Sequence, residues 1–291
     1  MSRKTQLKKE LHNLAARTPG SGKTHDARKA IAQRLANTLH QIGYPLRSIS
    51  EIRVKHIETY VQQRKQEIRV RSIHNDMTHI RQILKEAGKH KIAEHNRLRN
   101  ERLCGGKAER IPARTAPDPK TAEQIISTAS EKDAGVGAGL QLQKELGLRS
   151  EEAVKSVKSL GTWERQLQQG DKVRVVYGTK GGRPRDTRVP NVQQALTAVK
   201  TAREVADQRA GKLIDKPNID SALRRYNRVA AQAGAKGAHS PHSLRYFYTQ
   251  NIQNKYQEQG YSQQEARALT SQDLGHGDGR GRWVASVYNT H

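Results

Sequence analysis

The C-terminal half of the 291-residue chain contains a His-x-x-Arg motif whose side chains suit phosphate chemistry. In His242-Ser243-Leu244-Arg245 the imidazole and the guanidinium are three positions apart, so they would share one face of a helix. Ser240 is a typical helix cap, and Pro241 suits the first turn of a helix that begins there. We expect the pair to lie near the border of an apolar stripe formed by Leu244, Phe247, Tyr248 and Ile252.

Five further residues of the same half could complete a phosphate site. Arg149 stands at a predicted helix start with Glu152 three residues later, and Lys180 stands at the tip of a predicted hairpin. His276 follows a predicted helix, and Tyr288 lies near the end of the sequence. Transfer of a phosphoryl group to a tyrosine requires fixed cations, an acceptor for the phenol proton and an acid for the departing oxygen. The set contains a residue type for each task.

Each of these residue types suits one step of such a reaction. A guanidinium keeps its proton and offers a planar donor fork to two phosphate oxygens, as Arg149 and Arg245 could do. The phenol of tyrosine has a free pKa of about 10, so neighbouring cations and an acceptor such as His242 would favour the phenolate. A lysine on a flexible hairpin tip can reach the DNA backbone as an acid, and Lys180 fits that part.

The same hairpin has a second interpretation. Arg183 and Arg185 are the nearest rivals of Lys180 as the acid. Alternatively, the hairpin is a basic turn that grips DNA phosphate, and Arg183 and Arg185 are then DNA-binding residues that add affinity without chemistry. The sequence leaves both interpretations open.

The excess of basic residues indicates what kind of molecule the protein binds. Lysine and arginine outnumber aspartate and glutamate by 53 to 28, which gives a formal charge of +25. Such an excess favours binding to a polyanion, and double-stranded DNA is the leading partner. No apolar run approaches the ~18 residues of a membrane-spanning helix, and the basic N-terminus leads into no apolar signal segment. We therefore expect a cytoplasmic protein, nucleoid-associated when bound to DNA, with no membrane partner.

Other kinds of site are disfavoured. Cys104 is the single cysteine, so there is neither a disulfide framework nor a cysteine-based zinc ligand set. No cluster of Asp and Glu indicates a metal site, so we expect no metal and no cofactor. Residues 20–24, Gly-Ser-Gly-Lys-Thr, resemble part of a P-loop, but Arg17 stands where the first glycine belongs and no strand precedes it. A turn followed by a helix capped by Thr24 or Asp26 explains the segment better.

The apolar residues divide the chain into two predicted domains. From Thr5 to about His95 they recur every three or four residues, which predicts a small helical DNA-binding domain over residues 1–105. Glycine and proline then accumulate in a predicted linker, residues 106–118. The second domain, residues 119–291, is predicted to be helical except at residues 172–189, where alternation around a glycine-rich turn indicates a β-hairpin. The predicted fold is mainly α with a small antiparallel β-sheet (α+β).

In order and spacing, the candidate residues resemble the catalytic signature of the tyrosine recombinase (phage integrase) family: Arg, Lys, His-x-x-Arg, His or Trp, then Tyr. The resemblance covers nearly the whole chain, because members place a helical core-binding domain before a catalytic domain with a small sheet. It implies a role for each residue: Arg149 and Arg245 hold the scissile phosphate, Lys180 and His242 handle protons, His276 supports the phosphate, Glu152 orients Arg149, and Tyr288 attacks.

The resemblance also implies an activity and an assembly. The expected protein is a site-specific DNA recombinase that cleaves and rejoins DNA through a 3′-phosphotyrosyl intermediate, without metal or ATP. It would form a C-shaped clamp around DNA and a homotetramer on two synapsed duplexes, and an accessory DNA-bending protein remains open. The alternatives are a topoisomerase-like DNA-relaxing enzyme and a non-catalytic architectural or regulatory DNA-binding protein with the same fold.

Three features depart from the family pattern. Tyr246 stands where many relatives have a second histidine, and the twelve positions from His276 to Tyr288 exceed the usual spacing. Tyr288 remains the expected nucleophile because Tyr256 and Tyr261 precede His276. Three residues follow Tyr288, whereas relatives often carry a C-terminal segment that docks on a neighbouring subunit, so subunit contacts are expected to differ or the chain to be shortened.

Overall fold

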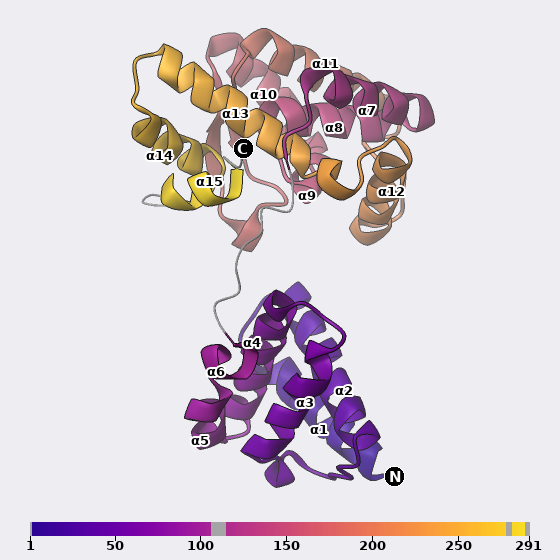
Figure 1. The fold of residues 1–291 in the computed structure, drawn as a ribbon. Helices are drawn as coiled ribbons and strands as arrows, with labels where there is room; N and C mark the ends of the chain where they lie inside the picture. Colours follow the sequence, from indigo (N-terminus) through magenta and orange to yellow (C-terminus); the bar gives the residue numbers. More distant parts are fainter. Residues whose placement is uncertain (1, 106–114, 278–280, 289–291) are drawn as a thin grey trace. The chain divides into compact units, whose positions relative to one another are not determined.

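The computed structural model describes residues 2–105, 115–277 and 281–288, with the side chain of Trp283 left out. The chain forms two compact units, Met1–Glu109 and Arg110–His291 (Figure 1). Most of the predicted linker, residues 106–114, lies outside the described residues, so the linker bounds remain a prediction. None of the helices in the described ranges is long and apolar enough to cross a membrane.

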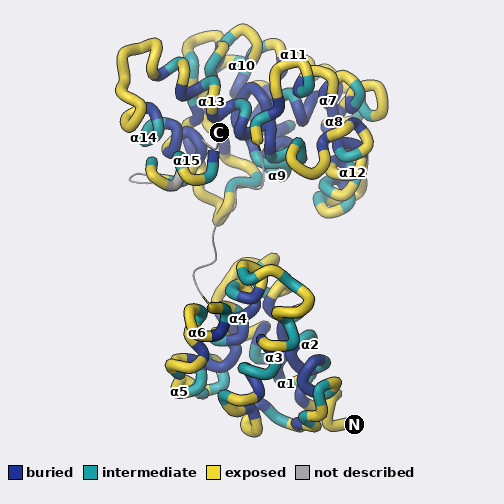
Figure 2. Tube along the Cα trace, viewed as in Figure 1, coloured by how far each residue is buried: buried dark blue, intermediate teal, exposed yellow. Residues whose placement is uncertain are grey.

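The N-terminal unit is entirely helical in its described part. Its four longer helices are α1 (Arg3–Arg17), α2 (Gly22–Gln41), α3 (Val54–Lys65) and α4 (Val70–Glu86), and they are joined by the shorter η1 (Ile49–Glu51), α5 (His90–Ala93), η2 (Asn96–Leu98) and α6 (Asn100–Cys104). The periodic apolar side chains of these helices form a single core, which appears as the dark blue interior in Figure 2. Ser21 caps α2 by accepting from the Thr24 backbone N–H, so the expectation of a cap at Thr24 or Asp26 was wrong by a few residues.

The C-terminal unit is also mainly helical. Its longer helices are α7 (Pro119–Lys132), α8 (Ala134–Leu146), α10 (Val157–Gln169), α11 (Val192–Asp207), α12 (Ile219–Gln232), α13 (Ser243–Glu258) and α14 (Gln263–Asp273), and its shorter ones are α9 (Ser150–Val154), η3 (Lys180–Gly182), η4 (Gly237–His239) and α15 (Gly281–Tyr288). Helix α8 lies at the centre of the unit and contacts α7, α11 and α13. A small residue permits the close approach of α7, since a Cβ on Gly137 would lie 2.7 Å from Ser130 Cα.

The only sheet in the described residues is the predicted hairpin. Strands β1 (Lys172–Val175) and β2 (Arg185–Arg188) pair antiparallel, with Val175 opposite Arg185. Val173, Val175 and Thr187 face the core, while Arg174 lies on the exposed face. The predicted fold class, mainly α with a small antiparallel sheet, is confirmed.

The start of α13 differs from the sequence expectation. The helix begins at Ser243 rather than Pro241, because the Ser243 N–H donates to Ser240 O (2.7 Å) in a tighter turn before the regular helix. Arg245 does not lie at the border of an apolar stripe but is fully buried. The reason is that α13 is covered on several sides, by α8, α14 and α15, so most of its first two turns face protein.

Gly147 ends α8 in a left-handed conformation that brings the chain close to α13. Its φ is +60°, and a Cβ at this position would lie 2.5 Å from the Tyr248 ring. A side chain would therefore meet both backbone strain and a steric overlap with a fully buried aromatic residue. Only glycine satisfies both constraints at this position, two residues before Arg149.

We expect Gly147→Ala to destabilise the C-terminal unit by about 2 to 4 kcal/mol, because strain and overlap add. The matched control is Gly211→Ala, where φ is +77° and no atom lies within 4 Å of the new Cβ. That variant should lose about 1 to 2 kcal/mol from strain alone. Urea unfolding followed by tryptophan fluorescence measures both, since Trp163 and Trp283 belong to this unit. Equal losses would contradict the role of the Tyr248 contact.

Candidate active site

The sequence-predicted site residues converge in the C-terminal unit from five separate segments. Arg149 precedes α9, Lys180 lies between β1 and β2, His242 precedes α13, His276 follows α14, and Tyr288 ends α15. One cavity of about 680 Å³ is lined by all five together with Thr179, Gly181, Arg183, Arg185 and Gly275. Arg245 lies directly behind this cavity, where its Nε donates to the Tyr288 Oη (3.3 Å). The structure thus brings the whole predicted set together.

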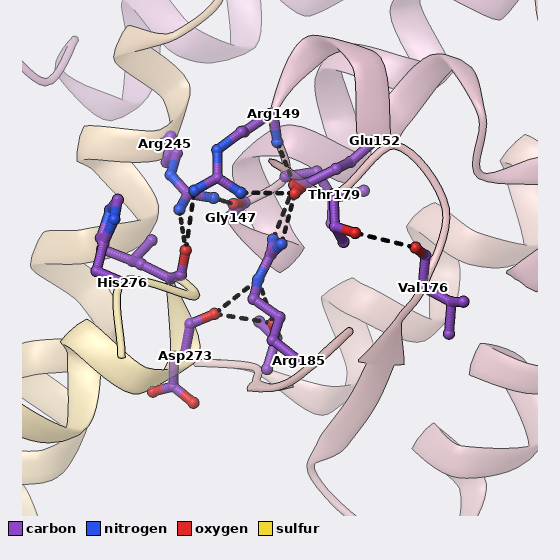
Figure 3. Close-up of polar contacts among 12 residues, drawn as sticks. Gly147, Arg149, Glu152, Val176, Thr179, Arg185, Arg245, Asp273 and His276 are labelled. Carbon is purple, nitrogen blue, oxygen red and sulfur yellow. Dashed lines mark hydrogen bonds and ion pairs between the residues drawn. The ribbon is translucent and has the colours of Figure 1, made fainter. Parts of the chain in front are cut away.

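Two arginines converge on one backbone carbonyl (Figure 3). Arg245 Nη2 donates to Leu274 O (2.5 Å), and Arg149 Nη2 donates to the same oxygen (3.3 Å). Arg245 Nη1 also donates to Gly147 O. Burial and the nearby charge of Arg245 lower the pKa of Arg149, although a guanidinium remains protonated. Both guanidinium planes are therefore fixed by main-chain acceptors before any substrate binds.

Glu152 supplies the negative charge that these arginines require. It accepts from the Arg149 N–H (2.7 Å) and from Arg149 Nη1 (2.7 Å), which forms a capping box at the start of α9. Arg185 pairs with both of its carboxylate oxygens, at 2.5 and 2.8 Å. Burial alone would raise the pKa of Glu152, but the hydrogen bonds and charge of Arg185, with Arg245 and Arg149, lower it to about 2. The carboxylate is ionised at any pH at which the protein would work.

Arg185 differs from its sequence expectation as a DNA-contacting residue. Its relative exposure is only 7%, against an exposed Arg183 two positions earlier in the same hairpin. The Arg185 fork is directed at Glu152, and its Nε donates to Asp273 O (2.9 Å) and Thr187 Oγ1 (3.1 Å). The alternating pattern of β2 places this arginine on the buried face of the strand. Arg183 and Lys180 are left as the exposed cations of the hairpin tip.

The C-terminal end of α14 is the second electron-rich centre of the site. Asp273 O accepts from Arg185 and Thr187, and Leu274 O accepts from Arg149 and Arg245. The last carbonyls of a helix lack partners within the helix and carry the negative end of its dipole. These two carbonyl oxygens therefore suit the guanidinium groups of Arg149, Arg185 and Arg245. Because every residue has a backbone carbonyl, no residue type in the sequence indicates this interaction.

The candidate nucleophile lies among aromatic rings and histidines. Tyr288 is only 2% exposed, and its Oη lies 3.5 Å from His276 Nε2. The ring centroids of His276 and His242 lie 6.2 and 6.4 Å from that of Tyr288. Tyr246, the residue that departs from the family pattern, packs against Tyr288 with centroids 4.5 Å apart. The departure therefore gives the nucleophile an aromatic neighbour; residues 278–280 of the longer spacing lie outside the described residues.

Asp273 is a site residue that sequence reasoning missed. Its side chain is 7% exposed and accepts from the Arg188 backbone N–H (3.0 Å) and the Tyr256 hydroxyl (2.7 Å). Burial raises the pKa of Asp273 to about 6, against the lowering effect of those hydrogen bonds. Its backbone oxygen accepts from Arg185 Nε, whereas its carboxylate bonds to the Arg188 N–H and the Tyr256 hydroxyl.

We expect Glu152→Gln to destabilise the protein by about 3 to 5 kcal/mol, because it removes the shared counter-charge of buried Arg185 and Arg149. The matched control is Asp186→Asn, which removes a carboxylate of the same unit that pairs with Arg174 on the protein surface. That loss should be at most about 1 kcal/mol. Urea unfolding compares the two, and a Glu152→Gln variant as stable as Asp186→Asn would contradict the ion-pair role.

The raised pKa of Asp273 predicts a pH-dependent stability. A carboxyl group whose folded pKa exceeds its ordinary 3.8 stabilises fully below 3.8, and that contribution is lost as the pH rises through about 6. The difference in unfolding free energy between Asp273→Asn and wild type should thus shift in favour of the variant by about 2 kcal/mol between pH 4 and pH 7. Urea unfolding at both pH values measures it, with exposed Asp215→Asn as the surface control. A pH-independent difference would contradict the assignment.

Comparison with known proteins places these observations in a family. The family model described as "Integrase" matches residues 106–251, and the model described as "Phage integrase, N-terminal" matches residues 4–93. No curated protein sequence matches the chain.

Two solved structures have similar folds. One is a lambda integrase tetramer bound to a Holliday junction, 15% identical with a TM-score of 0.59, where the match covers 97% of this chain and 77% of that one. The other is the Tn1549 transposon integrase in complex with transposon right end DNA, 14% identical with a TM-score of 0.56, where the match covers 100% and 95%. Both family models match, and the signature residues line one cavity or, in the case of Arg245, bond to Tyr288 at its wall, so the chain belongs to the tyrosine recombinase (phage integrase) family.

Proposed function

We propose that this protein is a site-specific DNA recombinase that cleaves and rejoins DNA through a 3′-phosphotyrosyl intermediate at Tyr288. Membership of the integrase family supports the recombinase function, and the geometry around Tyr288 supports the mechanism. The observation that carries the proposal is the position of the Tyr288 Oη, 3.3 Å from Arg245 Nε and 3.5 Å from His276 Nε2 beside a cavity lined by cations.

The arginines would stabilise the charge of the reacting phosphate. Three bonds to protein atoms fix the Arg245 guanidinium, and bonds to Glu152 and Leu274 O fix that of Arg149. A guanidinium carries five N–H donors, so groups held in this way can still donate to non-bridging phosphate oxygens. Preorganised donors of this kind contribute about 3 kcal/mol each to transition-state stabilisation.

The phenol proton requires an acceptor, and the distances favour His276. Its Nε2 lies 3.5 Å from the Tyr288 Oη. The resemblance to the family had implied the opposite assignment, with His242 handling the proton and His276 supporting the phosphate. We therefore assign the first proton transfer to His276, and contact with the phosphate to His242, which lines the same cavity. Arg245 Nε, which donates to the same oxygen, would stabilise the phenolate that forms.

Lys180 would complete the chemistry at the leaving group. Its side chain lies on an exposed loop that lines the cavity, from which an ammonium group can reach the 5′ oxygen of DNA. In the proposed step the Tyr288 oxygen bonds to phosphorus, the bond from phosphorus to the 5′ oxygen breaks, and Lys180 supplies the proton to that oxygen. The phosphotyrosyl bond retains the energy of the ester, so rejoining needs no ATP.

Charge and assembly are consistent with a DNA substrate. The chain carries a formal charge of +25, and the two similar structures are of integrases bound to DNA, one of them a tetramer on a Holliday junction. We propose that this chain likewise assembles as a homotetramer on two synapsed duplexes, acts in the cytoplasm, and associates with the nucleoid when bound. An accessory DNA-bending protein would be a further partner.

We expect Tyr288→Phe to abolish covalent capture of DNA while leaving DNA binding unchanged, because only the attacking oxygen is removed. The substrate is a nicked duplex pool of randomised sequence, and the readout is an SDS-stable adduct at low salt. Tyr261→Phe, which alters an exposed tyrosine, should form the adduct as wild type does.

Three outcomes would contradict the proposal. An adduct formed by Tyr288→Phe would exclude Tyr288 as the nucleophile. Tight, salt-dependent binding by wild type without any adduct would favour a non-catalytic DNA-binding protein. Relaxation of a supercoiled plasmid that lacks the captured sequence would favour a topoisomerase.

A further inference from the structure

The loop that carries Lys180 is anchored at both ends on the same short helix. At its start, Gly178 (φ +79°) packs so closely that a Cβ there would lie 2.7 Å from Glu151 O and 2.9 Å from Glu152 Cα. At its end, Arg185 pairs with the Glu152 carboxylate through two hydrogen bonds of 2.5 and 2.8 Å. Residues 179–184 therefore connect two points of contact with α9. Gly178 packs against the Glu152 backbone, and Arg185 bonds to the Glu152 carboxylate.

Between these anchors the loop forms local hydrogen bonds, from Thr179 Oγ1 to Val176 O (3.2 Å) and from the Gly182 N–H to Thr179 O (3.1 Å). Gly181 and Gly182 adopt positive φ, and a Cβ added to either would have no atom within 4 Å, which places their backbone in open space. Lys180, Arg183 and Pro184 are exposed. Because glycine-rich backbone samples many conformations, the reach of Lys180 into the cavity depends on where the two ends are fixed.

Arg185 also connects the other segments of the site. Its Nε donates to Asp273 O, and a Cβ on Gly275 would lie 2.7 Å from its Cδ, so its stem packs against the residue preceding His276. The buried Arg185 side chain thus contacts three parts of the site. It bonds to Glu152, which also binds Arg149, to Asp273 at the end of α14, and to Thr187 in its own strand β2. Lysine could not reproduce this, because it lacks the planar fork that binds two carboxylate oxygens.

We infer that Arg185 is a positioning residue that holds the Lys180 loop against Glu152, so that Lys180 protonates the departing 5′ oxygen; the inference rests on the proposed function. The position of Arg149 does not depend on the Arg185–Glu152 pair. Glu152 accepts two separate hydrogen bonds from Arg149, one from its backbone N–H and one from its Nη1. Loss of Arg185 should consequently impair protonation of the leaving group more than charge stabilisation at the phosphate.

The test compares two leaving groups on the duplex sequence recovered by adduct capture. One substrate has the natural 5′ oxygen, and the other has a 5′ bridging sulfur, which departs as a thiolate and needs no proton from an acid. With the oxygen substrate, Arg185→Gln should slow adduct formation by about 100-fold, as misplacement of a catalytic group by about 1 Å does. With the sulfur substrate its rate should return to within about 3-fold of wild type, as should that of Lys180→Ala.

Two further variants control for charge and for folding. Arg174→Gln removes an exposed guanidinium from the same hairpin and should match wild type on both substrates. Arg185→Lys keeps the buried positive charge but not the fork, and should lose about 10-fold on the oxygen substrate alone. Because the sulfur substrate requires an intact site, its cleavage by each variant also establishes that the variant is folded.

Each remaining outcome overturns the inference. Equal losses on both substrates would mean that Arg185 acts on the phosphate-binding arginines or on folding rather than on Lys180. An Arg185→Gln variant as fast as wild type on the oxygen substrate would mean that the loop needs no such anchor. Absence of any adduct from wild type on either duplex would instead remove the proposed function, and this inference with it.

Discussion

Mutual repulsion among three guanidinium groups is the constraint on which the site depends. Arg149, Arg185 and Arg245 meet in a largely buried space, where like charges are screened less than in water. Two electron-rich centres compensate them, the Glu152 carboxylate and the carbonyl end of α14. Because each centre bonds to more than one arginine, each offsets the charge of more than one guanidinium group.

The fold supplies these centres through element ends rather than element surfaces. Gly147 ends α8 with its carbonyl toward Arg245, Arg149 caps α9, α14 ends at the arginines, and α15 ends at Tyr288. Helix ends present backbone groups that lack partners within the helix, so they suit the binding of charged groups. Arg245 comes instead from the buried first turn of α13, and the exposed polar residues of that helix follow further along it, at Gln250, Asn254, Gln257 and Glu258.

Local sequence patterns predicted the fold class, and the candidate site residues that they indicated lie close together in the structure. The three- and four-residue periodicity located the longer helices, alternation located the hairpin, and the spacing of Arg149, Lys180, His242, Arg245, His276 and Tyr288 indicated the family. The partners of Arg185 could not be predicted, because no local pattern among 53 lysines and arginines shows which of them bonds to Glu152. These partners lie 33 and 88 positions away, and one of them is a backbone carbonyl. Asp273 was missed for a related reason, since its pKa depends on burial by distant segments.

The use of main-chain acceptors has a consequence for sequence divergence. The oxygens of Gly147, Asp273 and Leu274 that hold the arginines belong to the backbone, so most side-chain substitutions at the last two positions leave the acceptor in place. Selection then acts on where a helix stops and in which direction its last turn points, not on the identity of the residue there. A lineage can consequently replace most of its amino acids while the arginines stay aligned, in keeping with a common fold at only 14–15% identity.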